Sequence, residues 1–362
     1  MTTFVTSVVP TLTSTIRNTM PGSTTTSAQP TCTTATPGKY GHVPADACNA
    51  YYSYDPSFVA AVTFAVFFGI STVTHFGQAI WYKKKYLCSV ITMAALWETL
   101  AFVVRALGSR DQQSLGMVVI ATLLLLLAPI LINAFVYMTL GRMIYYFLPE
   151  RRIWRFKASS LAKTFVWLDI SAFVVQGAGG NMMSVEDSPS TNDTGRKVYM
   201  IGVGIQEFFI LIFVTIAARF HIRMNDLERR RQMVRNTPWK FLSWTLYTVL
   251  VLITMRILFR LVEFSSGTDL TNDLLRNEWY VLGLDALPML IAVFLLNLFH
   301  PGRSLVGPGS EFPRLSRKEK KALKQQKRAS KIRAKERKKT TKAAKRAGIS
   351  LEDHTSLRES AS

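Results

Sequence analysis

The sequence is poor in charged residues, and above all in acidic ones. Charged side chains make up 19% of its 362 residues, and 23 Asp and Glu stand against 44 Lys and Arg, giving a formal net charge of +21. An average soluble domain has about 25% charged residues. Because hydrophobic residues reach 49%, this composition excludes a chain that is disordered throughout, and it argues against an ordinary cytosolic enzyme.

Other absences exclude further classes of protein. Three cysteines are too few for a disulfide-dense secreted fold. The sequence has no GxxxxGK[ST] phosphate-binding loop, which excludes transport driven by the protein's own ATPase. It also has no HExxH metal-binding motif, and its last apolar run has no lysine that could hold retinal. The N-terminal residues contain no apolar stretch long enough for a cleavable signal peptide.

The basic residues are concentrated at the C-terminal end. From Arg303 to Ser362 there are 19 Lys and Arg against 6 Asp and Glu, so this stretch carries +13 of the net +21. The chain before it is lightly charged and very apolar. This distribution predicts a membrane protein with a basic tail.

Seven apolar runs reach the roughly 20 residues that a helix needs to cross a bilayer. Backbone polar groups in lipid must be bonded within the segment, so runs of this length are predicted to be helices. The fold class is therefore all-α, a polytopic bundle of seven transmembrane helices. The fourth run is the weakest, because it contains Asp169, Gln176 and the cluster Gly177–Gly180. The runs are Phe58–Trp81, Leu87–Leu107, Leu115–Met143, Leu161–Met182, Val198–Ala218, Phe241–Val262 and Tyr280–Phe299.

The charges of the connecting loops predict the orientation. With the N-terminus outside, the inner loops hold twelve basic residues against three acids, and the outer loops hold four basic residues against seven acids. Positively charged loops stay on the cytoplasmic side, so we expect the N-terminus outside and the C-terminus inside. The fourth run is needed for this pattern, since without it the basic tail would lie outside.

Three parts follow along the chain: an extracellular segment rich in Ser and Thr over residues 1–50, the helical domain over 51–303, and a basic tail over 304–362 that we expect to be disordered. Ser and Thr fill 18 of the 35 residues from 2 to 36, as in O-glycosylated stalks. Asn192 begins an Asn-Asp-Thr glycosylation sequon on the predicted outer side. Cys32 and Cys48 both lie outside and either form a disulfide or stay as two free thiols.

The basic tail has two interpretations. It is predicted to bind anionic lipids of the cytoplasmic leaflet, or else to act only as a solvated anchor that fixes the topology. Nucleic acid is not expected as a partner, because the run is tethered to a bilayer and lacks interleaved aromatic residues.

Ionisable groups inside membrane spans are costly and usually functional. Seven of them fall in the outer half of the predicted bundle. Either they form a structural ion-pair network, or they line a polar pocket for an amine or zwitterionic head group. The acids outnumber the bases by one, which leaves a carboxylate that an incoming ammonium could neutralise, with Asp285 and Glu98 as the expected acceptors. The seven are Glu98, Arg105, Glu207, Arg256, Arg260, Glu263 and Asp285.

A second set of polar residues lies in the fourth span and toward the inner side. It consists of His75, Asp169, Gln176 and His300. Two histidines and an aspartate could begin a metal site as in membrane hydrolases, but no third histidine lies at a matching depth. We predict neither a metal nor another cofactor.

Ordered motifs across all seven spans resemble one family. They include Tyr54-Asp-Pro56-Ser, Glu98 followed by Arg105, Leu140-Gly141-Arg142, Asp169 followed by Gln176, Gly204-Ile-Gln206, Arg256 to Gly267, Glu278 followed by Asp285, and His300-Pro301-Gly302. Over residues 51–303 the chain is similar to the fungal RTA-like, lipid-translocating exporter family. That resemblance implies membrane lipid handling, aminocholesterol and drug resistance, and export of sphingoid long-chain bases. Ala101-Phe102 stands where the family's Gly-Tyr pair is expected, which removes a phenolic hydroxyl.

The prediction as a whole is a fungal multi-pass membrane protein without enzymatic activity. It binds an amphipathic lipid, a sphingoid base or a sterol-like amphiphile, and either moves or senses it. The plasma membrane is the expected location, with the vacuolar and ER membranes as alternatives, and the oligomeric state is left open. The alternative functions are a seven-helix signalling receptor and a metal-dependent membrane hydrolase.

Overall fold

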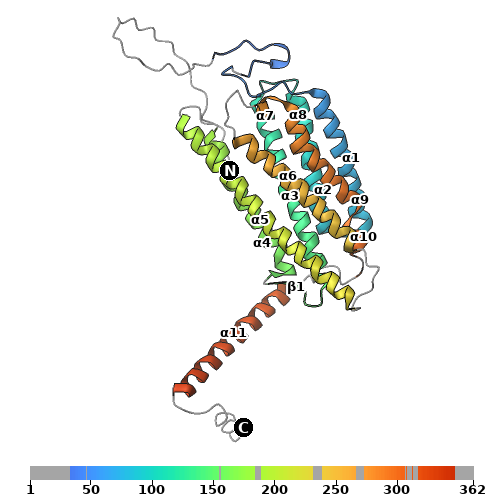
Figure 1. Ribbon diagram of the computed structural model, residues 1–362, viewed down its shortest axis with the longest axis vertical. Helices are drawn as coiled ribbons and strands as arrows, with labels where there is room; N and C mark the ends of the chain where they lie inside the picture. The colour runs from blue at the N-terminus through green and yellow to red at the C-terminus, as the bar shows by residue number, and fades with distance from the viewer. Residues whose placement is uncertain are drawn as a thin grey trace, which may run out of the picture.

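Long helices dominate the structure, a computed structural model (Figure 1). It describes residues 33–45, 47–154, 156–183, 189–230, 239–265, 273–305, 307, 312 and 317–346. Seven helical spans are long and apolar enough to cross a membrane, which confirms the predicted fold class.

The helices begin and end close to the predicted apolar runs, except that the fifth is much longer. The first six spans are α1 (Phe58–Tyr82), α2 (Lys85–Gly108), α3 (Leu115–Phe147), α4 (Ala158–Met183), α5 (Pro189–Arg229) and α6 (Trp239–Ser265). The seventh span, Glu278–Ser304, consists of α8 (Glu278–Val281), the π-helical turn η2 (Leu282–Ala286), α9 (Leu287–Leu298) and α10 (Pro301–Ser304). Short elements are η1 (Lys39–Gly41), the antiparallel strands β1 (Arg152–Ile153) and β2 (Phe156–Lys157), and α7 (Asp273–Arg276).

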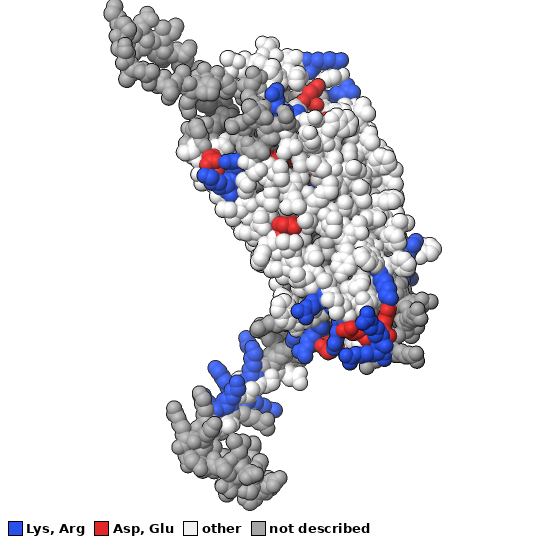
Figure 2. All heavy atoms as spheres, in the orientation of Figure 1, with Lys and Arg blue, Asp and Glu red and all other residues white. Residues whose placement is uncertain are grey.

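Successive helices pack beside one another from α1 to α6, and α9 returns to contact both α1 and α6. In Figure 1, α6 runs between α5 and α9 across the front of the bundle. Large apolar side chains cover the outside: Phe67, Trp167 and Phe241 are all more than half exposed. Figure 2 shows a wide belt of uncharged residues between the two charged ends of the bundle. Such a surface suits lipid contact, and the protein is a multi-pass membrane protein.

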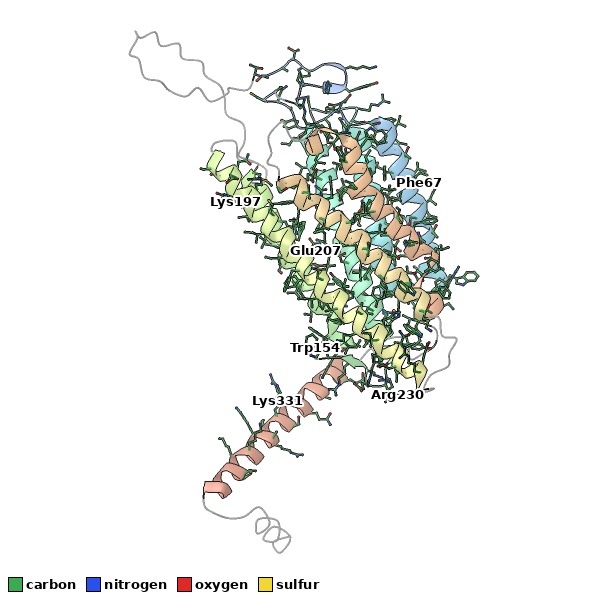
Figure 3. The ribbon with its side chains drawn as sticks, in the orientation of Figure 1. Phe67, Trp154, Lys197, Glu207, Arg230 and Lys331 are labelled. Atoms are coloured by element: carbon green, nitrogen blue, oxygen red, sulfur yellow. The ribbon has the colours of Figure 1, made fainter. Side chains whose placement is uncertain are left out.

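The two ends of the bundle differ in charge. We call the end that carries residues 33–57, the α2–α3 turn and α8 the N-terminal face. The opposite end, with the β1–β2 hairpin and α10, is the tail face. Basic side chains gather at the tail face and beyond it (Figure 2), where Trp154 and Arg230 also lie (Figure 3). That the tail face is cytoplasmic remains a prediction.

Glycines explain why the fourth span is the least apolar of the seven. A Cβ on Gly179 of α4 would lie 2.7 Å from the Gly195 carbonyl oxygen of α5, and one on Gly202 of α5 would lie 2.9 Å from the Gln176 nitrogen. Helices in membranes use small residues where their backbones approach closely. Of the α4 glycines, Gly179 therefore makes the close contact with α5, whereas a Cβ on Gly177 or Gly180 would meet nothing within 4 Å.

The seventh span is interrupted at Asp285. The Leu287 N–H bonds to the Leu282 carbonyl, five residues back, instead of four. Pro288 follows at once and has no N–H to continue the ordinary ladder. Single π turns of this kind occur frequently at functional sites, and this one holds Asp285 buried in the bundle.

Outside the bundle, the structure differs from the expected disorder of the tail. Residues 317–346 form the helix α11 (Arg317–Arg346), which projects away from the tail face (Figure 1). The stretch contains neither Gly nor Pro, and Lys, Arg, Ala, Gln and Glu fill most of it. These residues have high helix propensity, so a helix forms without the apolar stripe that the sequence lacks.

The segment before α1 and the beginning of α5 contain the remaining predicted features. Cys48 is disulfide-bonded, and its N–H donates to the Thr33 carbonyl at 3.2 Å. Cys32, the expected partner, lies outside the described residues. Asn192 lies in the first turns of α5, half-buried, and its glycosylation stays a prediction.

Candidate functional site

Four charged residues, three of them buried and one partly buried, meet where α6 contacts the π turn of the seventh span. The Asp285 carboxylate lies between two guanidinium groups: Oδ1 is 2.5 Å from Arg256 Nε, and Oδ2 is 2.5 Å from Arg260 Nη2. Arg260 Nη1 also contacts Glu263 Oε2 at 3.3 Å. We call Arg256, Arg260, Glu263 and Asp285 the α6–η2 cluster. Since both Asp285 oxygens already meet arginines, this carboxylate is poorly placed to accept an incoming ammonium.

A second ion pair lies nearer the N-terminal face. Arg105 Nη2 is 2.9 Å from Glu278 Oε1 and also donates to the Tyr54 hydroxyl. The other carboxylate oxygen of Glu278 accepts from the Ser57 N–H at 2.8 Å. Glu278 and Tyr54 were not among the predicted site residues, although both belong to the family motifs. Their positions just before the predicted first and seventh spans could have marked them as candidates.

Glu98 is a buried carboxylate without a cationic partner in the described part of the chain, and it borders the α6–η2 cluster. Its side chain is on α2 with only 1% of the residue exposed, and its Oε2 has no hydrogen-bond partner among the described residues. The sequence places Glu98 and Arg105 on one helix face, but Arg105 pairs with Glu278 instead. The charged groups that act on Glu98 are Arg256 and Asp285. Glu98 therefore borders the α6–η2 cluster without pairing with it.

Glu207 is separate from that cluster. It lies about half-way along α5 (Figure 3), buried, with Thr254 of α6 as a neighbour. Its Oε2 has no hydrogen-bond partner in the described part of the chain. The seven predicted residues thus form two ion-pair groups and two lone acids, rather than one network.

Two hollows accompany these charges. The larger, about 530 Å³, opens at the N-terminal face and is lined by Tyr54, Asp55, Ser57, Glu278, Trp279 and Tyr280, among others. That volume is within the range of small-molecule sites. A much smaller cavity of about 10 Å³, enough for roughly one water molecule, is lined by Gln176, Tyr199, Gln206, Arg256 and Arg260 among others.

Asp169 and Gln176 make separate contacts on α4. Asp169 Oδ2 accepts from Asn133 Nδ2 at 3.1 Å and from the Tyr137 hydroxyl at 2.9 Å, both on α3. Gln176 donates to Gln206 of α5 at 2.8 Å. The fourth span therefore turns its polar residues toward α3 and α5.

His75 and His300 lie in the tail-side half, away from Asp169. Their ring centroids are 6.3 Å apart, and His75 Nε2 lies 3.3 Å from the Val293 carbonyl. His300 Nδ1 accepts from the Gly302 N–H at 3.0 Å, which caps α10. Among the described residues, no group of three or more His, Cys, Asp or Glu side chains could hold a metal ion. The histidines have structural partners instead.

Comparison with known proteins identifies the family. The family described as "RTA1 like protein" matches residues 91–307, more than half of the chain. The chain belongs to the RTA1-like family. This confirms the resemblance seen in the motifs. No solved structure matches the RTA1-like chain.

Named relatives of this RTA1-like protein come from fungi. The probable lipid transporter atnI of Emericella nidulans is 44% identical over 308 residues, covering 82% of this chain and 80% of the relative. The sphingoid long-chain base transporter RSB1 of Saccharomyces cerevisiae is 26% identical over 310 residues, 74% of this chain and 78% of the relative. Protoporphyrin uptake protein 1 of the same yeast is 27% identical over 283 residues, 68% of this chain and 90% of the relative.

Proposed function

We propose that this RTA1-like protein transports an amphipathic lipid with a cationic head group, a sphingoid long-chain base, across the membrane. The observation that carries the proposal is Glu98, a buried carboxylate with no cationic partner among the described residues. A buried unpaired charge is costly, and the ammonium of a sphingoid base would neutralise it. The name of the relative RSB1, a sphingoid long-chain base transporter, supports this substrate, and that of atnI, a probable lipid transporter, supports lipid transport.

In this proposal the arginines hold the paired acids in place, and Glu98 binds the head group of the lipid. Arg256 and Arg260 hold Asp285, and Arg105 holds Glu278, so these acids keep the seventh span against α2 and α6. Glu98, which borders these pairs and has an oxygen without a hydrogen-bond partner among the described residues, would accept the head group. The hydrocarbon chain would lie against the apolar helix surfaces, where no charge has to be removed from water.

The hollow at the N-terminal face would be where the head group leaves or enters. Its lining combines the aromatic rings of Tyr54, Trp279 and Tyr280 with the acids Asp55 and Glu278 and one base, Arg276. Aromatic faces and carboxylates both attract an ammonium group. The Arg105–Glu278 ion pair borders this hollow. Separation of that ion pair would connect the hollow to the α6–η2 cluster.

The tail would bind the anionic leaflet on its side of the membrane. Helix α11 contains 16 Lys and Arg against two Glu, and polybasic segments of this kind bind anionic lipids. The tail face would then be cytoplasmic and the protein would reside in the plasma membrane, whose inner leaflet is anionic.

The alternative functions receive less support. A metal-dependent hydrolase requires a metal site, whereas His75 and Asp169 bond to different helices. A signalling receptor remains compatible with seven helices, so the test has to measure movement of the lipid itself and not only resistance of cells.

The test is counterflow of a labelled sphingoid base into liposomes that contain the purified protein. We expect wild-type protein and Glu98→Asp to exchange the lipid, and Glu98→Gln to lose exchange at an unchanged level of folded protein. The Asp111→Asn variant is the comparison, because it converts an acid to its amide at an exposed site in the α2–α3 turn. Exchange by Glu98→Gln at the wild-type rate would overturn the assignment of Glu98, and binding without exchange would favour a sensor.

A further inference from the structure

Asp169 is a buried carboxylate in the middle of α4, beside a cluster of three aromatic rings. Tyr137 of α3, Phe165 of α4 and Phe213 of α5 pack together with ring centroids 4.5 to 5.5 Å apart. Each of these rings is at most 1% exposed, and Asp169 itself is 1% exposed. The carboxylate therefore lies in the apolar interior rather than in a hydrated groove.

The partners of Asp169 are all neutral. Oδ2 accepts from Asn133 and Tyr137, while Oδ1 has no hydrogen-bond partner among the described residues. Asn133 Oδ1, on the side chain that contacts Asp169, is also without a partner there. Two buried acceptor oxygens without a donor can be satisfied if the carboxyl group carries a proton.

The charged residues on the elements packed against α4 do not neutralise Asp169. Helix α3 carries Arg142, β2 carries Lys157, and α5 carries Glu207 near its middle and further charged residues toward its two ends. Among the described residues, none of these forms an ion pair with Asp169. The titratable group that faces Asp169 is Tyr137, and Glu207 is close enough to act electrostatically on the same tyrosine. Ionisable residues in spans that lack a counter-ion are typical of proton relays.

We propose that Asp169 binds and releases a proton during transport, so that this protein exchanges a cationic lipid for a proton. The coupling rests on the function proposed above, whereas proton binding by Asp169 does not. One proton joins the carboxylate from one side of the membrane and leaves to the other side. One lipid ammonium crosses in the opposite direction, so each cycle moves no net charge.

The packing offers a connection between Asp169 and the lipid site. Asp169 and Gln176 are two turns apart on the buried face of α4, and Gln176 bonds to Gln206. These two glutamines line the same small cavity as Arg256, which in turn acts on Glu98. Loss of the proton would place a charge on α4 next to α3 and α5, and a shift of α4 would reach Glu98 through this cavity.

The first test measures proton-driven transport in liposomes. A gradient of one pH unit can sustain at most about a tenfold lipid gradient for one-to-one exchange. We expect wild-type protein to approach this ratio. Asp169→Asn, which resembles the protonated acid, should keep counterflow but build no gradient. The control is Asp111→Asn, the same chemical change at an exposed site in the α2–α3 turn. A wild-type response from Asp169→Asn would overturn the proposal.

The second test observes the proton directly and does not depend on transport. A component of the infrared carbonyl band of protonated carboxylic acids should decline as pH rises in wild-type protein and be missing from Asp169→Asn, where any contribution of Glu98 and Glu207 stays. If Asp169→Asn fails to fold, Asp169→Glu should keep both the band and the pH response. If wild-type protein moves no lipid, the function proposed above fails, and this band alone decides whether Asp169 binds a proton. Absence of a titrating band in wild-type protein would overturn proton binding.

Discussion

Arg256 Nε and Asp285 Oδ1 lie 2.5 Å apart, and this ion pair joins α6 to the π turn of the seventh span. Arg260 occupies the other oxygen of the same carboxylate. A carboxylate held at both oxygens by arginines has a structural role first, since removing it would leave the buried Arg256 without its carboxylate partner and Arg260 with Glu263 alone. The residue that remains free to bind a cation is the neighbouring Glu98.

This arrangement predicts opposite effects for two acid-to-amide substitutions. Asp285→Asn should lower the yield and thermal stability of the folded protein, because breaking a buried ion pair costs about 3–5 kcal/mol. Glu98→Gln should leave both unchanged and abolish lipid movement. Size-exclusion profiles and melting curves in detergent measure the first effect, and counterflow measures the second. A stable, inactive Asp285→Asn would instead restore Asp285 as the ammonium acceptor.

The contact between α4 and α5 gives a prediction with an internal control. Gly179→Ala should destabilise the bundle by about 1–3 kcal/mol, as overpacking does, because its Cβ would lie 2.7 Å from the Gly195 oxygen and 2.8 Å from the Tyr199 Cα. Gly177→Ala on the same helix meets nothing within 4 Å and should be neutral or slightly stabilising. Melting temperatures compare the two. Equal melting temperatures for the two variants would show that the α4–α5 contact can widen without a loss of stability.

The seven spans could be predicted from the sequence because the bilayer imposes both a length and an apolar composition on each helix. Even α4 was found, since the loop charges required it. The pairing of the buried charges could not be predicted in the same way. Arg105 and Glu98 are seven residues apart on α2, yet Arg105 pairs with Glu278, 173 positions further along the chain. That choice depends on how α2 is rotated toward α8, which hydropathy does not specify.

The same limit applies to the polar residues predicted toward the inner side. His75 and Asp169 are both internal polar residues, and the sequence grouped them as members of one set. Their hydrogen bonds reach Val293 on α9 and Tyr137 on α3. Position along a helix gives depth in the membrane, but the direction in which a side chain faces comes only from the packing. The π turn at Asp285 also rotates the side chains that follow it relative to a regular α-helix. The presence of Pro288 in the sequence does not by itself predict this turn.

The basic helix at the tail predicts a salt-dependent interaction with anionic membranes. A peptide of residues 314–346 should bind vesicles with anionic lipid, at about 1 kcal/mol for each basic residue near the surface, and binding should decline as salt screens the charges. A peptide with Lys331, Arg333 and Lys335 replaced by Gln should bind measurably less. Equal binding to neutral and anionic vesicles would eliminate this role and leave the helix as a topology anchor.

The charge difference between the two faces predicts the orientation, and with it the direction of transport. Because the inner loops and the tail carry the excess of Lys and Arg, insertion should retain the tail face in the cytoplasm. A tag placed after Ser362 should therefore survive protease treatment of intact cells, whereas a tag at the N-terminus should be removed. Permeabilised cells are the control, since both tags should then be cleaved. Loss of the C-terminal tag from intact cells would reverse the topology, and Glu278 with its hollow would then face the cytoplasm.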